Sequence, residues 1–282
     1  MKILITGASG FCGRNLLPRL RAEEGEVYSL VRTSSGAKNE ILWNFTDPVP
    51  TGIPECDVVI HLAASVDFGK DFCPQTYLIN VGATSQLVAY ARKSGSHFIF
   101  ASMTGIHGGA ERLGKDTPID LQNNYAASKY LAESVVSAQL DSYSILRMGG
   151  IYGLDGPIHL GLNTAISNAF HRGESPVLRG SGKAKRNYIC INDVVTWIKT
   201  LVSQGRKKRK EILYLGGPEE LSVRDYLERV AKHLLKDASE VELKDGGDGT
   251  DSIVEGTQPP FRLTPFAEYL DGLLSKKNTG KV

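Results

Sequence analysis

The chain has 282 residues, of which 41% are hydrophobic and 23% charged, and its formal net charge is +2. This length accommodates one large domain or a domain with a smaller lobe, and the composition is that of an ordinary globular protein. The small net charge gives no reason to expect nucleic acid as a partner. The four cysteines lack CxxC spacing, which predicts reduced thiols of a cytoplasmic protein and no metal site. No run approaches about 18 apolar residues, so no membrane partner is expected.

The N-terminal residues combine a strand pattern with a glycine-rich turn. Lys2–Thr6 reads KILIT, which predicts a buried strand, and a helical pattern follows Gly13. Between them, Gly7 is placed for a tight turn, Gly10 for close approach of a pyrophosphate, and Gly13 for packing of the helix against the strand. The sequence therefore predicts a dinucleotide-binding turn at the N-terminus of a helix.

The spacing of these glycines, in the stretch TGASGFCG, resembles that of the extended short-chain dehydrogenase/reductase family of nucleotide-sugar epimerases, dehydratases and reductases. The resemblance implies an α/β fold: a doubly wound parallel sheet (Rossmann-like) with a smaller C-terminal substrate-binding lobe. It places the dinucleotide-binding domain at residues 1–153 and the lobe mainly at 154–282, with a segment at about 186–215 returning to the sheet. It also implies cofactor contacts from Ser9, Phe11 and Cys12 of the turn.

The helix predicted after Gly13 contains a potential helix breaker. Leu16, Leu17 and Leu20 form a stripe that faces the core. Pro18 lies within that stripe, and a proline inside a helix costs up to about 3 kcal/mol. We therefore expect this helix to be kinked or shortened at Pro18.

The end of the second predicted strand, Glu26–Val31, indicates which nicotinamide cofactor is used. An acidic residue at this place would bind the 2′-hydroxyl of the adenosine ribose and repel a 2′-phosphate. The sequence instead continues with Arg32, Thr33, Ser34 and Ser35. A guanidinium and hydroxyls suit a phosphate, so Arg32 and Ser34 favour NADP(H) over NAD(H).

Three further segments correspond to cofactor and substrate positions of the family. Asn44 and Phe45 stand where a polar and an apolar residue contact the adenine. Residues 56–64 (CDVVIHLAA) predict a strand whose end runs beneath the cofactor ribose. By resemblance, Leu62, Ala63 and Ala64 at the end of that strand contact the cofactor. Val66 and Asp67, on the loop after it, are expected to contact the substrate.

A predicted helix at 77–94, ended by Gly95, carries Asn80, where the family keeps an asparagine near the active-site lysine.

The strand at 97–101 ends in a serine- and threonine-containing run. In the family this run supplies a catalytic hydroxyl, which aligns here with Met103. Ser102 or Thr104 is expected to supply the hydrogen bond after a small backbone adjustment; alternatively, the tyrosine acts alone or catalysis is impaired.

Tyr125 and Lys129 form the Y-x-x-x-K pattern of the family's catalytic pair. Four residues apart on a helix, they share a face. A nearby ammonium is expected to lower the pKa of the tyrosine from its usual value of about 10. Tyr125 would then exchange a proton with a sugar hydroxyl or carbonyl, and Lys129 would also hold the nicotinamide ribose.

The remaining signals lie in the C-terminal half. Met148 and Ile151, in the stretch RMGGIYG, match a family segment whose backbone lines the nicotinamide. Arg186, in the stretch RNYICINDV, matches the arginine that grips the diphosphate of a nucleotide-sugar. The basic run at 206–210 (RKKRK) is interpreted as a solvated loop.

Together these features predict an NADPH-dependent reductase of a keto group on a nucleotide-activated (deoxy)sugar, with hydride from the nicotinamide and the proton from Tyr125. The absence of an acid after the second strand favours this over a 4-epimerase with tightly bound NAD. Reduction of a carbonyl compound without a nucleotide, and a cofactor-sensing protein that has lost catalysis, also remain open. By resemblance alone, a homodimer would form through the helices that carry Asn80 and Tyr125.

Overall fold

The computed structural model describes residues 1–23, 25–235 and 240–279. The chain divides into two compact units, which interleave along the sequence. The first unit comprises Met1–Gly108, Pro118–Met148 and Val195–Leu213, and the second comprises Gly109–Thr117, Gly149–Val194 and Tyr214–Val282. These boundaries differ from the expected ones, since the second unit begins its main segment at Gly149 and also takes the short segment after Gly108.

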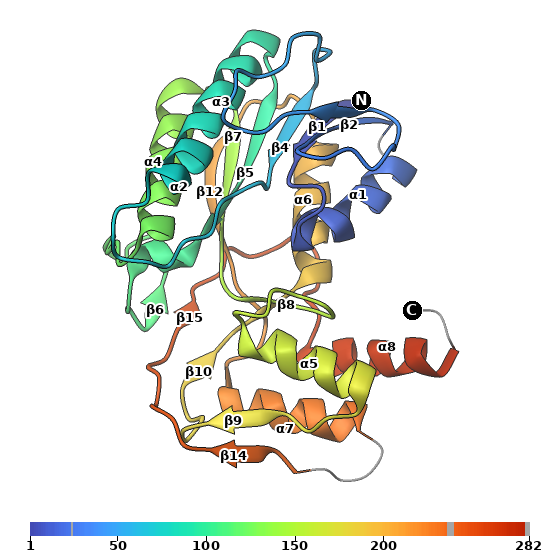
Figure 1. The fold of residues 1–282 in the computed structure, drawn as a ribbon, viewed down its shortest axis with the longest axis vertical. Coiled ribbons are helices and arrows are strands. Elements are labelled where there is room, and N and C mark those ends of the chain that lie inside the picture. Colours follow the sequence, from blue (N-terminus) through green and yellow to red (C-terminus); the bar gives the residue numbers. More distant parts are fainter. Residues whose placement is uncertain (24, 236–239, 280–282) are drawn as a thin grey trace. The chain divides into compact units, whose positions relative to one another are not determined.

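The first unit is built on a seven-stranded sheet, which confirms the predicted Rossmann-like fold (Figure 1). The pairs that join β1 to β2 and β4, β2 to β3, and β5 to β4 and β7 are parallel. The chain builds outward from β1, first through β2 to β3 and then in the other direction from β4, as in a doubly wound sheet. In spatial order the strands are β12 (Lys210–Leu215), β7 (Tyr143–Met148), β5 (His97–Met103), β4 (Val58–His61), β1 (Lys2–Thr6), β2 (Glu26–Val31) and β3 (Glu40–Leu42).

Helices cover both faces of this sheet (Figure 1). α3 (Ala83–Ser94) and α4 (Asn124–Gln139) pack side by side on one face, while α1 (Phe11–Glu23) and α6 (Ile191–Ser203) lie on the other. The short helix α2 (Pro74–Tyr77) runs through a π-helical turn directly into α3. The predicted stop at Gly95 is confirmed, because this residue takes a left-handed conformation with φ of 64°.

The strands are buried because both faces of the sheet are covered. All four residues of β4 and all six of β7 are buried, which agrees with their nearly continuous apolar sequences. Leu4, Phe98 and Ile145 belong to one core cluster between the sheet and the helices on one side. The carboxyl ends of β1, β2 and β4, where such folds bind ligands, are therefore held on a rigid base.

The predicted early end of the first helix at Pro18 is wrong, whereas a kink there stays a prediction. α1 continues through Pro18 to Glu23. Proline removes one backbone hydrogen bond from the helix interior. Leu16 and Leu20 on either side are fully buried, and the burial of two leucine side chains, at about 1.5–3 kcal/mol each, offsets that loss.

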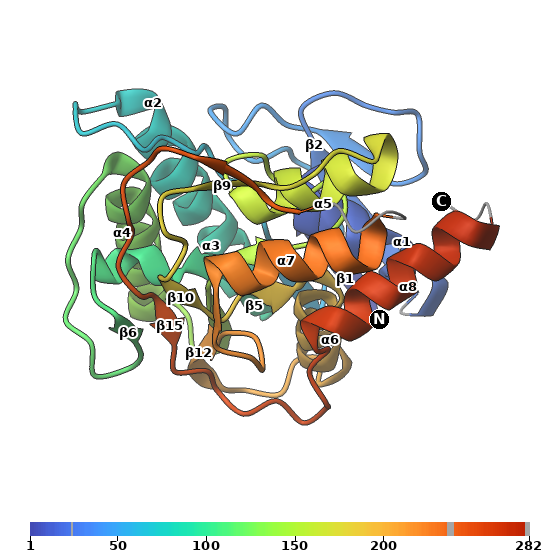
Figure 2. The same ribbon diagram turned by 90° about the horizontal axis from the view of Figure 1, so that it is seen from below.

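The second unit consists of helices and pairs of short strands (Figure 2). Its helices α5 (Gly161–Arg172), α7 (Val223–Leu234) and α8 (Phe266–Thr279) pack against one another. Ser222 caps α7 in a capping box with Asp225. The strand pairs are β6 (Arg112–Leu113) with β15 (Ile253–Val254), β8 (Ile151–Tyr152) with β11 (Ile189–Cys190), β9 (Val177–Arg179) with β14 (Glu242–Lys244), and β10 (Lys185–Arg186) with β13 (Leu221–Ser222).

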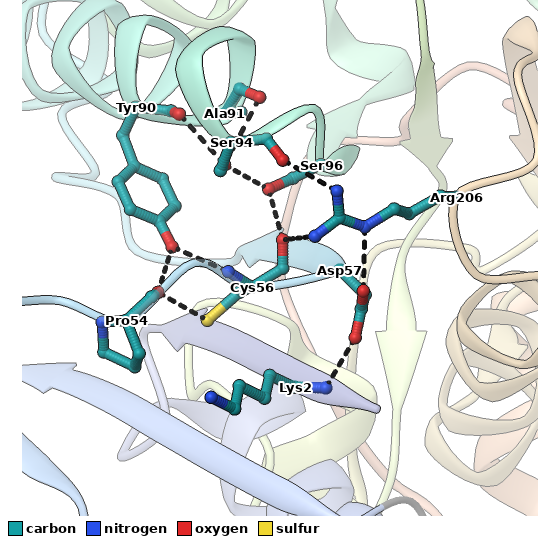
Figure 3. Close-up of polar contacts among 9 residues, drawn as sticks. All are labelled: Lys2, Pro54, Cys56, Asp57, Tyr90, Ala91, Ser94, Ser96 and Arg206. Carbon is teal, nitrogen blue, oxygen red and sulfur yellow. Dashed lines mark hydrogen bonds and ion pairs between the residues drawn. The ribbon is translucent and has the colours of Figure 1, made fainter.

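Most side chains of the basic run 206–210 are exposed, as predicted for a solvated loop, but two of its arginines are bound to partners. Arg206 Nε donates to Asp57 Oδ1 at 2.8 Å, and Arg206 Nη1 donates to the carbonyl of Ser94 at the end of α3 at 2.9 Å (Figure 3). Arg209 bonds Glu211. The hydrogen bond from the backbone amide of Lys2, and to a smaller extent the one from Arg206, holds the pKa of Asp57 below its usual range. Arg206 therefore ties the start of β4 to the end of α3.

We expect Arg206→Ala to destabilise the first unit by about 1 kcal/mol, because the charged hydrogen bond that caps α3 at the Ser94 carbonyl is lost. The partly exposed ion pair with Asp57 contributes little. The control is Lys208→Ala, which removes an exposed charge from the same run and should change the free energy of unfolding by no more than about 0.5 kcal/mol. Urea denaturation of the two variants checks this. Equal midpoints would show that the Arg206 contacts are energetically neutral.

Candidate active site

The glycine-rich turn has the tight backbone that its sequence predicts. Gly7 takes a positive φ of 71°, and a Cβ there would lie 2.6 Å from the nitrogen of Ala63. A Cβ on Gly13 would lie 2.1 Å from the Gly7 oxygen. Both positions therefore require glycine. The N-terminus of α1 begins immediately after Gly10, and its first N–H groups have no acceptor within the helix.

A cavity of about 250 Å³ opens beside this turn, at the carboxyl ends of β1, β2 and β4. Eight predicted cofactor residues line it: Gly7, Ser9, Gly10, Arg32, Phe45, Leu62, Ala63 and Ala64. The sequence analysis did not assign Ala8, Leu30, Val31, Ser65 and Ile79, which also line it. Leu30 and Val31 are the last two residues of β2, directly before Arg32. Their place at the end of that strand could have identified them as cavity residues.

The two residues predicted to bind a 2′-phosphate are placed differently. Arg32 lines the cavity. Ser34 Oγ instead donates to Glu40 at 2.8 Å, and the backbone N–H of Ser35 donates to the same carboxylate oxygen at 2.7 Å. Ser35 Oγ donates to the other carboxylate oxygen at 2.7 Å, and this bond, followed by that of the Ser34 hydroxyl, holds the pKa of Glu40 below its usual value. Because Glu40 pairs with Ser29, two residues before the end of β2, it draws the serine loop back from the strand's end.

The predicted adenine pair is also divided. Phe45 lines the cavity, is 6% exposed, and adopts a left-handed φ of 69° that is unusual for this residue type. Asn44 lies outside the lining, because its side chain closes its own turn. Its Oδ1 accepts from Thr46 and Asp47, and its amide donates to the Asp47 carboxylate.

Asn80 lies outside the lining but fixes a residue that is in it. Its Oδ1 accepts from the Ser65 N–H at 2.7 Å, and its Nδ2 donates to the Ser65 carbonyl and to Ser128 Oγ, both at 2.8 Å. Asn80 belongs to the π-helical turn before α3. Asn80 therefore connects the cavity wall to Ser128 of α4, which lies three residues after Tyr125.

Tyr125 and Lys129 lie in the first turns of α4, but their expected mutual effect on the tyrosine is wrong. Burial, and to a smaller extent the nearby Cys12, raises the pKa of Tyr125 to about 12. Lys129 Nζ lies 3.8 Å from the centre of the Phe100 ring, and burial lowers its pKa to about 7. Tyr125 is therefore a neutral phenol at physiological pH.

A buried ion pair stands next along this helix. Glu133, one turn after Lys129, accepts from Arg147 of β7, with Nη2 at 2.7 Å and Nε at 3.2 Å. Glu133 and Arg147 are 3% and 8% exposed. The Glu133 carboxylate acts to raise the pKa of Lys129, against the effect of burial. Lys129 thus contacts the Phe100 ring. The carboxylate that attracts its ammonium, Glu133, is already paired with Arg147.

The end of β5 has hydroxyls, but neither is exposed. Thr104 Oγ1 donates to the carbonyl of Met148 at 3.4 Å and is buried. Ser102 Oγ is buried, and among the residues described it has no hydrogen-bond partner. Because side chains alternate along a strand, Ser102 and Met103 face opposite sides of β5. The catalytic role predicted for either hydroxyl stays a prediction.

Three other predicted contacts lie near this region without lining the cavity. Phe11 is the first residue of α1 and packs against the guanidinium of Arg14, 5.1 Å from the ring centre. Burial raises the pKa of the Cys12 thiol to about 12, so this thiol is protonated and unreactive. Met148 ends β7 and is 8% exposed. Their predicted contacts with a cofactor are untested.

The predicted substrate residues belong to both units. Val66 is exposed in the first unit, and Asp67 uses its carboxylate to accept from Gly69 N at 2.8 Å and Asn124 Nδ2 at 3.1 Å. In the second unit, Ile151, which was predicted to contact the cofactor and not the substrate, begins β8, and the predicted substrate residue Arg186 lies in β10. Arg186 Nη1 donates to the carbonyls of Lys185 at 2.7 Å and Thr250 at 2.6 Å. Its guanidinium also interacts with the side chain of Tyr188, and its contact with a diphosphate stays a prediction.

The model of the NAD dependent epimerase/dehydratase family matches residues 3–216 of this chain. The chain belongs to this family. A UDP-glucose 4-epimerase of Mycolicibacterium smegmatis is 29% identical over 224 residues, which cover 69% of this chain and 71% of that protein.

Solved structures share the fold of this chain. The structure of MoeE5 in complex with UDP-glucose and NAD superposes with a TM-score of 0.78 at 22% identity, covering 100% of both chains. A dTDP-4-dehydrorhamnose reductase of Bacillus anthracis in complex with NADP gives a TM-score of 0.76 at 16% identity, covering 98% of this chain and 99% of that one. At these identities the likeness establishes the fold.

Within the described residues, no helix has the length and apolar character needed to cross a membrane. In the same part of the chain, no group of three or more histidine, cysteine, aspartate or glutamate side chains is arranged to hold a metal ion.

Proposed function

We propose that this protein reduces a keto group on a nucleotide-activated sugar, with hydride from NADPH and a proton from Tyr125. The observation that carries the proposal is the charge of the cavity lining. Arg32 stands at the end of β2 and lines the cavity, and no carboxylate is among the lining residues that the structure describes. A cation without an acid at this place suits a ribose 2′-phosphate.

The residues present fit a dinucleotide. The backbone of Gly7 and Gly13 is too close to its neighbours for any side chain, and the exposed N–H groups at the start of α1 suit a pyrophosphate. Phe45 and Ile79 provide apolar surface in the cavity. The reduced nicotinamide, when bound, supplies the hydride. The adenosine end would be held by Phe45 and Arg32, and the ribose beneath it by the backbone at Leu62, Ala63 and Ala64.

The state of Tyr125 suits proton donation. With a pKa of about 12, its phenol carries a proton at neutral pH and can donate it to a carbonyl oxygen as that carbonyl is reduced. An epimerase must first remove a proton from a sugar hydroxyl, which needs tyrosinate. Since Met103 has no hydroxyl, Tyr125 would be the donor to the substrate oxygen without help from that position.

A 4-epimerase with bound NAD is the second candidate. The relative from Mycolicibacterium smegmatis is a UDP-glucose 4-epimerase, and MoeE5 was solved with UDP-glucose and NAD. The bond of Ser34 to Glu40 also removes one hydroxyl that would have gripped a phosphate. A diphosphate contact from Arg186, homodimerisation through α3 and α4, and a cytoplasmic location remain predictions.

Titration with NADPH and NADH, followed by nicotinamide fluorescence, tests the cofactor assignment. We expect NADPH to bind more tightly. Arg32→Ala should remove that advantage, because losing one charged phosphate contact costs about 1.5–3 kcal/mol, or roughly ten- to a hundredfold in affinity. Lys38→Ala removes a charge from the same loop but lies outside the cavity lining, so it is the matched control.

Equal or tighter binding of NADH by the wild-type protein would contradict the NADPH assignment and favour the epimerase. If NADPH is preferred, turnover of nucleotide-linked 4-keto sugars is measured next. Oxidation of NADPH in proportion to the keto sugar added would support the reductase. Interconversion of two nucleotide-sugars without net NADPH oxidation would identify an epimerase.

A further inference from the structure

A single buried asparagine clamps Ser65 in the wall of the cavity beside the glycine-rich turn. Asn80 is 2% exposed. Its Oδ1 accepts from the backbone N–H of Ser65 at 2.7 Å, and its Nδ2 donates to the Ser65 carbonyl at 2.8 Å. Because a backbone N–H can only donate, this pair of bonds fixes the orientation of the Asn80 amide. Both backbone polar groups of Ser65 are therefore occupied.

The same amide joins Ser65 to the helix that carries Tyr125. Asn80 Nδ2 also donates to Ser128 Oγ at 2.8 Å, and Ser128 Oγ donates to the carbonyl of Tyr125 at 2.9 Å. Ser128 lies in α4, between Tyr125 and Lys129. The Ser65 end of the cavity wall is therefore the end that is connected to α4.

The hydroxyl of Ser65 is the polar group of this residue that has no internal role. Ser65 is half-buried and lines the cavity. Among the described residues its Oγ has no hydrogen-bond partner. The fully buried side-chain atoms that lack a partner there belong to Ser29, Ser102 and Tyr152, so the Ser65 hydroxyl is accessible. It can both donate and accept a hydrogen bond.

We propose that the Ser65 hydroxyl binds the ribose that carries the nicotinamide. This inference rests on the proposed function, because it requires a dinucleotide in the cavity. The proposed function places the adenosine end at Arg32 and Phe45 and the pyrophosphate at the glycine-rich turn. Ser65 belongs to the part of the lining that is connected to α4, where the reacting end of the cofactor has to lie beside Tyr125. A ribose hydroxyl donates and accepts hydrogen bonds, as a serine hydroxyl does.

The clamp prepares Ser65 for this contact before a ligand binds. Its backbone is held at both the N–H and the carbonyl, so only the rotation of one short side chain has to be fixed on binding. A preorganised contact keeps more of its binding free energy than one made by a mobile segment. Ser65 is also the one polar side chain within residues 62–66 (LAASV). A neighbour in this segment therefore cannot replace its hydroxyl.

Ser85→Ala is the matched control for Ser65→Ala. Ser85 is half-buried in α3, and its hydroxyl donates to the carbonyl of Val81 at 2.9 Å. Both variants delete one hydroxyl from a half-buried serine of the first unit, but Ser85 does not line the cavity. Because the Ser65 hydroxyl has no partner among the described residues, Ser65→Ala should unfold at the same temperature as wild type.

Calorimetric titration of the full chain with two ligands tests the assignment. NADPH contains the nicotinamide ribose, whereas adenosine 2′,5′-bisphosphate contains the adenosine end with its 2′-phosphate alone. Ser65→Ala should bind NADPH about fivefold more weakly than wild type, which is the usual effect of one lost hydrogen bond between neutral groups. Its affinity for the bisphosphate should be unchanged, and Ser85→Ala should bind both ligands as wild type does. A general disturbance of the cavity would instead weaken both ligands.

An unchanged affinity of Ser65→Ala for NADPH, or an equal loss for both ligands, would overturn the role of Ser65. If wild type prefers NADH, the NADPH assignment fails, and the comparison is made between NADH and adenosine diphosphate. A loss in Ser65→Ala for NADH alone would then still support the contact with the nicotinamide ribose, and no loss would refute it. If wild type binds neither dinucleotide, both proposals fail.

Discussion

Replacement of Tyr125 by phenylalanine is expected to lower kcat for the reduction of a nucleotide-linked keto sugar by about 10²–10⁴-fold, because a positioned general acid contributes that factor. The affinity for NADPH should change little, since Tyr125 does not line the dinucleotide cavity. Folding should also be preserved, because the aromatic contact with Phe68 needs the ring and not the hydroxyl. Steady-state kinetics with a fluorescence titration of the cofactor measures both quantities.

Tyr130→Phe is the matched control, because it deletes a phenolic hydroxyl from the same helix α4. It should leave kcat unchanged. Five residues separate the two positions, so they point in different directions around the helix. Turnover that survives Tyr125→Phe at the wild-type rate would remove Tyr125 from the chemistry and leave a cofactor-binding protein without this catalytic group.

Local patterns in the sequence predicted the fold and the dinucleotide turn well. A buried strand, a glycine triplet and a helix within about 25 residues leave few alternatives, because each glycine answers a backbone constraint set by its immediate neighbours. The positive φ of Gly7 and the close packing at Gly13 confirm this. The second strand, Glu26–Val31, was predicted with the bounds that the structure gives.

Contacts between residues distant in the chain could not be read in this way. Arg206 is bound to Asp57, a residue 149 positions earlier, so a run of basic residues gave no sign of its partner. The pKa of Tyr125 was misjudged for a related reason. The i, i+4 spacing shows that Lys129 is near, but it does not show that burial of the phenol outweighs a neighbouring ammonium.

The candidate site shows the same division. Arg32 was identified as a cavity residue because it directly follows β2. The hydrogen bond that turns the Ser34 hydroxyl to Glu40 depends on how the loop folds back, which the sequence does not show. The ring contact between Phe68 and Tyr125 joins residues 57 positions apart, so no local pattern in the sequence indicated it. Asp67 was assigned to substrate from its place on the loop, and this stays a prediction; its carboxylate accepts a hydrogen bond from Asn124.

Replacement of Gly13 by alanine is expected to lower the stability of the protein strongly, although alanine favours a helix more than glycine does. Gly13 lies inside α1, where alanine is normally better than glycine by about 1 kcal/mol. Here the added Cβ would lie 2.1 Å from the Gly7 oxygen and 2.6 Å from Ala8 Cα. Because both are backbone atoms, the turn itself must move. We expect a loss of about 3 kcal/mol in the stability of the first unit and loss of measurable NADPH binding.

Gly10→Ala separates stability from binding in the same turn. Its Cβ would approach the Gly7 oxygen at 3.3 Å, which a small adjustment accommodates, so the free energy of unfolding should stay within about 1 kcal/mol of wild type. Its affinity for NADPH should nevertheless fall, because the methyl group occupies the space that the pyrophosphate needs. Thermal unfolding and cofactor titration of both variants make the comparison. A stable Gly13→Ala variant that binds NADPH normally would show that the turn adapts, and the close packing of α1 against β1 would then not be what shapes the cavity.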